Sequence, residues 1–188
     1  NNFYKNFLNL LADHSCDHLI DQIDLRAFLI GENSRLYLFD GLRTDEPTKW
    51  VANLQKSPNT IVRYGTVKER TVKGKAGNDK VTAIQKGVDI LLSIEALEAA
   101  YSHGMQKATI FSNDSDFLPL IDALVRKGVE TEVKGFGSAH VGTSVSEFQM
   151  RADSYIELSE KDVWQVVRKK FAEYAYDEHL KIVSDWKF

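Results

Sequence analysis

The hydrophobic positions of this chain follow two spacings in turn, which predicts an alternation of helices and strands. Short apolar runs typical of buried strands occupy 36–39, 60–64, 108–111, 129–133 and 155–158. Helical spacing governs 4–12, 19–30, 48–55, 87–102, 117–126, 144–150 and 160–176. The alternation predicts an α/β fold, a three-layer sandwich in which helices cover both faces of a mainly parallel central sheet.

The segment Ala108–Phe117 carries the densest candidate chemistry. An apolar strand ends there, and two carboxylates, Asp114 and Asp116, follow it one residue apart. Ligands of open α/β sheets bind beyond the carboxyl ends of the strands. Carboxylates this close repel each other unless a cation or a proton separates them, and Mg²⁺ takes oxygen ligands. The same residues also suit a turn and a helix N-cap, so the pair alone leaves both interpretations open.

A third carboxylate, Asp89, falls in the first turn of the predicted helix 87–102, where the helix dipole favours a negative charge. The spacing predicts one large apolar face that packs on the sheet. That face consists of Ile90, Leu91, Ile94 and Leu97. A neighbouring stripe of mostly small side chains would let a ligand or another backbone approach. That stripe consists of Asp89, Ser93, Ala96 and Ala100.

A basic segment, residues 66–86, leads into that helix. Its alternating residues Arg70–Lys73 predict a protruding hairpin or flexible arm. Only Glu69 and Asp79 oppose its positive charge. The segment is either a solvated loop or an arm that grips phosphates. Its basic residues are Lys68, Arg70, Lys73, Lys75, Lys80 and Lys86.

Composition narrows the function classes. The chain has 188 residues, of which 43% are hydrophobic and 27% charged, as in an ordinary globular protein. Cys16 is the one cysteine, so an internal disulfide and a cysteine-ligated zinc site are excluded and a cytoplasmic location is expected. No apolar run approaches the roughly 20 residues that span a bilayer. The net charge of −3 argues against coating of nucleic acid by bulk charge, but it permits a nuclease with a local basic rim.

Four segments resemble the NYN domain family, the LabA-like branch of the PIN-like nucleases, in their order and spacing. The matching segments are Lys86–Asp89, Ser112–Phe117, Lys127–Val133 and Ala152–Leu158. The resemblance covers residues 1–158, with 66–86 as a basic insertion, and leaves 159–188 as a C-terminal helical extension. It implies a PIN-like, Rossmann-like sandwich.

The resemblance also implies an activity. Asp89, Asp114 and Asp116 would hold Mg²⁺ or Mn²⁺ and act as the catalytic carboxylates of a ribonuclease that hydrolyses RNA phosphodiester bonds. RNA is the implied partner, and DNA stays open because no reader of a 2′-hydroxyl can be named. A homodimer and fusion to further domains also stay open. The expected substrate-binding residues are Asn2, Arg70, Lys73, Lys75, Lys86, Ser112 and Asn113.

The family pattern opens with a strand that ends in Asp-Gly-x-Asn. Asn1–Leu11 resemble this motif from its asparagine onward, with Asn2 in that place, so the strand and its metal-binding Asp are expected before Asn1. The alternative takes residues 35–41 as this first strand, with Asp40 as its acid. We prefer to interpret that segment as the second strand, because no helix-forming asparagine segment follows it.

Two other functions stay open. A catalytically silent NYN-type module would keep the fold, bind RNA or a protein, and bind metal weakly. A phosphatase that uses Mg²⁺ would need a nucleophilic Asp at the end of a first strand, and Asp40 is the one loose fit. We prefer the nuclease, because function is better argued from the carboxylates than from the fold alone.

Overall fold

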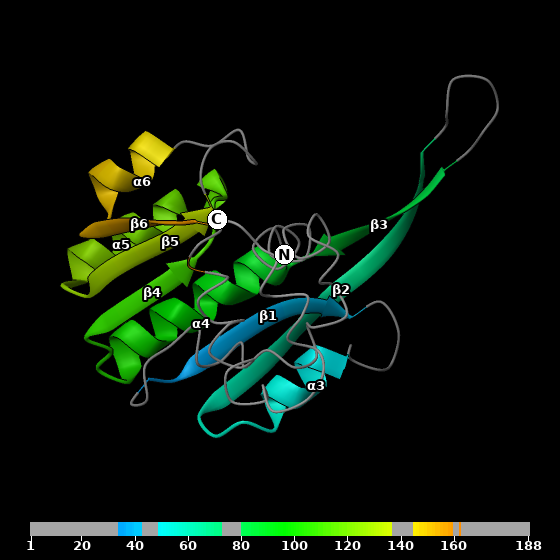
Figure 1. Cartoon of the computed structure of the whole chain (residues 1–188), viewed down its shortest axis with the longest axis horizontal. Coiled ribbons are helices and arrows are strands. Elements are labelled where there is room, and N and C mark those ends of the chain that lie inside the picture. Colours follow the sequence, from blue (N-terminus) through cyan, green and yellow to red (C-terminus); the bar gives the residue numbers. More distant parts are fainter. Residues whose placement is uncertain (1–33, 43–48, 73–79, 137–144, 160–161, 163–188) are drawn as a thin grey trace, which may run out of the picture.

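The strands of the computed structural model, which describes residues 34–42, 49–72, 80–136, 145–159 and 162, form two three-stranded sheets (Figure 1). In the first sheet, β1 pairs parallel with β2, and β2 pairs antiparallel with β3. In the second sheet, β4, β5 and β6 are all parallel. The strand bounds are β1 Leu36–Leu42, β2 Thr60–Val72, β3 Lys80–Lys86, β4 Lys107–Phe111, β5 Glu130–Phe136 and β6 Ser154–Leu158.

Helices flank both sheets. α3 packs on β2, α5 packs on β5, and α6 packs on α5 and β6. α4 contacts β1 and β2 and also α5, so it joins the two halves of the molecule. The bounds are α3 Lys49–Gln55, α4 Val88–Ser102, the 3₁₀ turn η2 Ser115–Phe117, α5 Leu118–Lys127 and α6 Val145–Arg151. The predicted α/β class with parallel strands and flanking helices is therefore confirmed, while the described strands belong to two sheets and not to one.

Local chemistry explains where α5 begins and ends. Pro119 lies in the first turn, where a missing N–H leaves no helical hydrogen bond unmade. Gly128 ends the helix in the left-handed conformation at φ 83°, and its N–H points to the carbonyls of Leu124 and Val125. Both residues therefore occupy the helix ends that their backbone chemistry favours.

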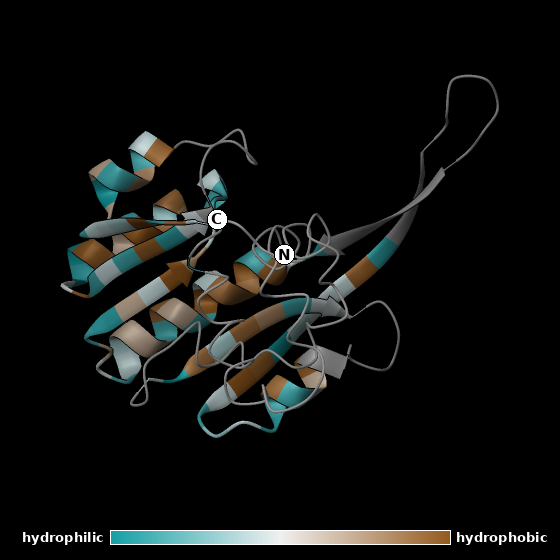
Figure 2. Ribbon diagram, viewed as in Figure 1, coloured by the Kyte–Doolittle hydropathy of each residue, from teal (hydrophilic) through white to brown (hydrophobic). Residues whose placement is uncertain are grey.

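The main hydrophobic cluster lies between the second sheet and its helices. Ile121, Leu124, Val133 and Phe148 are each 0% exposed. Figure 2 shows the apolar residues of α4 and α5 beside the strands of this sheet. Burial of these side chains stabilises the half of the molecule that carries Asp114, since apolar burial is the dominant favourable term in folding.

The predicted orientation of α4 is only partly correct, because Leu97 of the predicted face packs against the main cluster whereas two other members of that face are exposed. Ile90 is 66% exposed and Ile94 is 56% exposed, although both were assigned to the sheet-packing face. Ala96 and Ala100, from the stripe of small residues, instead contact the main cluster. Because α4 is apolar on several sides, its spacing does not single out one face, and the small side chains allow the closer approach.

The basic hairpin exists as predicted, and it is longer than the short strand 60–64 suggested. β2 runs for 13 residues and turns back as β3, and Figure 1 shows the pair extending away from the rest of the fold. At its base, a Cβ on Gly65 would lie 2.5 Å from Cγ2 of Val88, so glycine permits β2 to pass directly over the start of α4.

Several predictions fall outside the described residues. These are the helices 4–12, 19–30 and 160–176, the residues Asn2, Lys73 and Lys75, and nearly all of the extension 159–188. Within the part of the chain that the structure describes, no helix is long and apolar enough to cross a bilayer.

Candidate active site

The carboxyl ends of the parallel strands point to one side of the molecule. Figure 1 shows the arrowheads of β1, β4 and β5 on the same side, and α4 begins there as well. α4 packs against η2, the turn that follows β4. Helix α4 and the loop after β4 are therefore neighbours, and both lie near the edge where α/β sheets bind ligands.

The loop after β4 is fixed by its own side chains. Ser112 is buried, its N–H donates to the carbonyl of Lys134 at 3.1 Å, and its hydroxyl accepts from the N–H of Asp114 at 3.0 Å. Oδ1 of Asp114 accepts from the N–H of Asp116 at 3.0 Å and caps η2. Asp114 therefore performs the turn-and-cap role, and its half-buried carboxylate has a defined direction.

Asn113 lies buried over the neighbouring strand. A Cβ at Gly135 of β5 would clash with Oδ1 of Asn113, so this amide occupies the space that the glycine leaves. On the next strand, burial raises the pKa of the Tyr155 hydroxyl and the charge of Glu157 raises it further. The amide of Asn113 acts in the opposite direction, although the pair lies outside strict hydrogen-bond geometry. Asn113 is therefore held by packing across β5 and β6.

Asp89 is exposed in the first turn of α4, as its sequence position predicted. Gly87, in the left-handed conformation at φ 79°, precedes the helix and redirects the chain from β3 into α4. The carbonyl of Asp89 accepts from the hydroxyl of Ser93 at 2.9 Å. The carboxylate of Asp89 is thus presented to solvent at the helix end where the backbone dipole favours negative charge.

Asp40 lies at the carboxyl end of β1, in the first sheet. Its Oδ1 accepts from the N–H of Gly41 at 2.8 Å, and its charge adds to the burial that raises the pKa of the neighbouring Tyr64. The structure therefore gives Asp40 a local backbone role beside β2.

The candidate site offers carboxylate oxygens as possible metal ligands. The carboxylate oxygens of Asp89, Asp114 and Asp116 suit Mg²⁺ or Mn²⁺ in kind. Within the described ranges, no group of three His, Cys, Asp or Glu residues is close enough to hold an ion. Since Mg²⁺ commonly uses one or two protein carboxylates, several waters and substrate phosphates, these residues fit a sparsely ligated site and not a closed cage.

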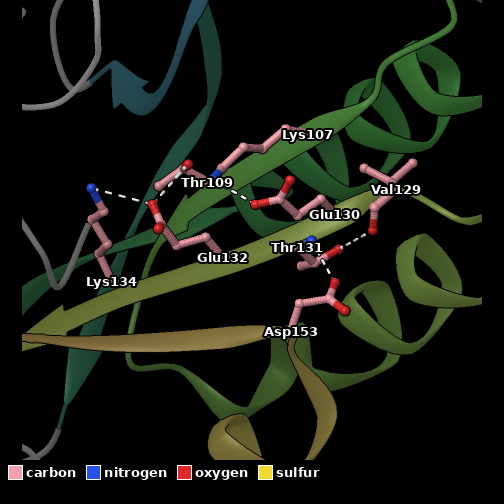
Figure 3. Close-up of polar contacts among 8 residues, drawn as sticks. All are labelled: Lys107, Thr109, Val129, Glu130, Thr131, Glu132, Lys134 and Asp153. Carbon is pink, nitrogen blue, oxygen red and sulfur yellow. Dashed lines mark hydrogen bonds and ion pairs between the residues drawn. The ribbon is translucent and has the colours of Figure 1, made fainter.

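The second sheet carries polar contacts that sequence reasoning did not single out. Oε1 of Glu132 accepts from Oγ1 of Thr109 at 3.1 Å and lies 3.2 Å from Nζ of Lys134 (Figure 3). Toward β6, the N–H of Thr131 donates to Oδ2 of Asp153 at 2.8 Å. Glu132 and Asp153 are thus hydrogen-bonded within the second sheet, whereas Asp114 and Asp116 lie in the loop after β4.

Of the predicted substrate-binding residues, Ser112 and Asn113 are buried supports of the loop, and Lys86 is exposed at the end of β3. Arg70 lies in β2 within the hairpin. Gly65 and Gly135 were not predicted to be site residues. A glycine inside a strand signals close approach of another group, and both positions fit that rule.

Fold and site together define a mixed α/β protein of the PIN-like type, with carboxylates at the edge formed by the carboxyl ends of its strands. The NYN domain model matches residues 11–159, so the chain belongs to the NYN domain family, which is nuclease-like. Comparisons with curated proteins and with solved structures find no match.

Proposed function

We propose that this NYN domain is a divalent-metal-dependent ribonuclease in which Asp89, Asp114 and Asp116 supply carboxylates to one or two Mg²⁺ or Mn²⁺ ions, whose other ligands are waters and substrate phosphates. The observation that carries the proposal is the fixed geometry of the loop after β4. Two hydrogen bonds from backbone N–H groups to the side chains of Ser112 and Asp114 orient Asp114 at the carboxyl end of β4, and the helix that carries Asp89 packs against the turn that follows. Nucleases of this type usually use divalent metals.

Each residue has a separate proposed role. A metal bound there would lower the pKa of a water and neutralise charge on the scissile phosphate. Asp114 and Asp116 supply oxygen ligands whose backbone is already ordered by the cap. The exposed Lys86 binds a phosphate near Asp89, and buried Ser112 and Asn113 keep the loop in place.

The test is cleavage of a labelled single-stranded RNA by the full-length protein in Mn²⁺, with EDTA as the metal-removal control. Asp114→Asn and Asp89→Asn should each abolish cleavage and weaken Mn²⁺ binding measured by calorimetry. The matched control is Glu98→Gln, which removes one negative charge from an exposed position further along α4 and should leave both measurements unchanged.

Two results would contradict the nuclease. Cleavage that survives in Asp114→Asn or in EDTA would identify a contaminant or another site. RNA binding without cleavage, together with weak Mn²⁺ binding, would favour the catalytically silent module, which the absence of a three-acid group from the described residues also allows.

A further inference from the structure

The register of the hairpin sorts its charges onto one side. We call β2 residues 66–72 and β3 residues 80–86 the ribbon. Opposite residues of an antiparallel pair share a face, and successive residues alternate between faces. The pairs on one face are Thr66 with Lys86, Lys68 with Ile84, Arg70 with Thr82, and Val72 with Lys80.

We call this face the basic face, because it holds every lysine and arginine of the ribbon. The other face pairs Val67 with Gln85, Glu69 with Ala83, and Thr71 with Val81. It contains the ribbon's one acid and no basic residue. The sequence pattern alone shows a basic segment, whereas the pairing shows a surface with one charged side.

The spacing of the basic face is regular. Each paired step of two residues advances about 6.8 Å along an antiparallel ribbon. Each of the four pairs, which are three steps apart in total, carries one positive residue, in the order Lys86, Lys68, Arg70 and Lys80 from base to tip. The row therefore extends roughly 20 Å. Its base is Lys86, and Gly87 and the first turn of α4 with Asp89 follow directly in the chain.

Exposure at the base of the ribbon agrees with this assignment. Thr66, Lys68 and Lys86 of the basic face are exposed, whereas Val67 between them is only partly exposed. The basic face is therefore the solvent side where β2 and β3 leave the first sheet.

We infer that the basic face binds the phosphate backbone of single-stranded RNA and directs it toward Asp89. The choice of RNA rests on the proposed function. Charge complementarity favours a polyphosphate, and a flexible single strand can follow the row of positive residues along a twisted ribbon. The phosphates of a duplex are fixed on its own helical path and cannot adapt to the ribbon in this way. The inferred substrate is therefore a single-stranded segment several nucleotides long.

The test measures RNA binding by the full-length protein in EDTA, where cleavage is stopped, across a range of salt concentrations. Lys68→Gln with Arg70→Gln should reduce the slope of log K against log salt by about 1.4, because each single-strand phosphate contact contributes roughly 0.7. The matched control is Thr71→Glu with Gln85→Glu, which changes the net charge equally on the opposite face and should leave the slope unchanged.

A second double variant guards against the possibility that the first variant lowers RNA binding only because it misfolds. Lys80→Gln with Lys86→Gln removes the same charge from the other strand of the basic face and should reduce the slope equally. Equal slopes for the basic-face and control variants would overturn the inference, and so would a duplex of the same sequence that binds as tightly as the single strand.

Failure of this inference differs from failure of the proposed function. If the slopes are equal but cleavage still requires Asp114 and Mn²⁺, the nuclease stands and the ribbon has no role in binding. If the slopes differ as expected but no variant or metal affects cleavage, the ribbon binds RNA and the nuclease proposal fails.

Discussion

The second sheet is built around a shared core, whereas the first sheet extends part of its length away from the fold. β4 and β5 pack under α5 and α6, and the loop after β4 is fixed by the hydrogen bonds of buried Ser112 to Asp114 and Lys134. β2 and β3 continue past the end of β1 as a two-stranded ribbon with basic residues on one face. The second sheet thus orders the loop that carries Asp114 and Asp116, whereas the first sheet presents a basic surface. If the two sheets differ in this way, a change in one sheet should have little effect on the other.

The largest expected effect lies in the core of the second sheet. Phe148 of α6 is 0% exposed, so Phe148→Ala should lower the free energy of unfolding by about 3–5 kcal/mol through lost burial and a cavity. The measurement is urea denaturation, with Met150→Ala on the same helix as the control. Met150 is 76% exposed and should change stability by less than about 0.5 kcal/mol. Equal losses of stability for the two variants would contradict the idea that the buried core of the second sheet stabilises this half of the molecule.

The two close-packed glycines should disturb different regions. Gly135→Ala forces a Cβ against the amide of Asn113, and Gly65→Ala forces one against Val88 and the carbonyl of Lys86. Each should cost roughly 1–3 kcal/mol, as overpacking does. Amide chemical shifts should change at Asn113 for the first variant and at Val88 for the second. Changes at both residues in either variant would show that the sheets respond as one unit.

Two variants of Asp114 can distinguish the effect of its negative charge from the effect of its hydrogen bond that caps η2. Asp114→Ala removes the oxygen that accepts from the N–H of Asp116 and should cost about 0.5–2 kcal/mol. Asp114→Asn keeps a capping oxygen and should be nearly neutral in stability while it abolishes cleavage. Thermal denaturation beside the cleavage assay checks both statements. A stability loss in Asp114→Asn equal to that in Asp114→Ala would mean that the charge itself holds the loop.

The smallest expected effect is at alkaline pH. Burial raises the pKa of Tyr155 above 10.0, so the folded state keeps the proton that the unfolded state loses first. This contribution to stability is complete below pH 10 and disappears as pH rises through the folded pKa. Urea midpoints between pH 8 and pH 11 should fall less in Tyr155→Phe than in the wild type. An identical fall of the urea midpoint in both proteins would show that Tyr155 does not contribute to the loss of stability at alkaline pH.

Much of the fold was predictable because local chemistry marks it. The proline and glycine at the ends of α5, the strand before Asp114, and the helix start at Asp89 all depend on residues close in the chain. The predicted roles of Asp89, Asp114 and Asp116 stay predictions, to be tested by the assays above.

The remainder depends on contacts between distant segments. The prediction failed for Ile90 and Ile94 of α4 because apolar residues surround the helix, and tertiary packing buries Ala100 beside Leu97 instead. The sorting of charge on the ribbon needs the pairing of β2 with β3, which no local pattern sets. The role of Gly135 depends on Asn113, a residue of another strand's loop.

Helix α4 begins against one sheet and ends against the other. Val88 contacts Gly65 of β2, and Ala100 lies in the cluster around α5. Hydrogen exchange along this one helix would therefore record two opening reactions, with amides near its start following the first sheet and amides near its end following the second. RNA bound to the ribbon should slow hydrogen exchange in the first turns of α4 and leave its last turn unchanged. The difference in exchange rate between the two ends of α4 would therefore report whether RNA is bound.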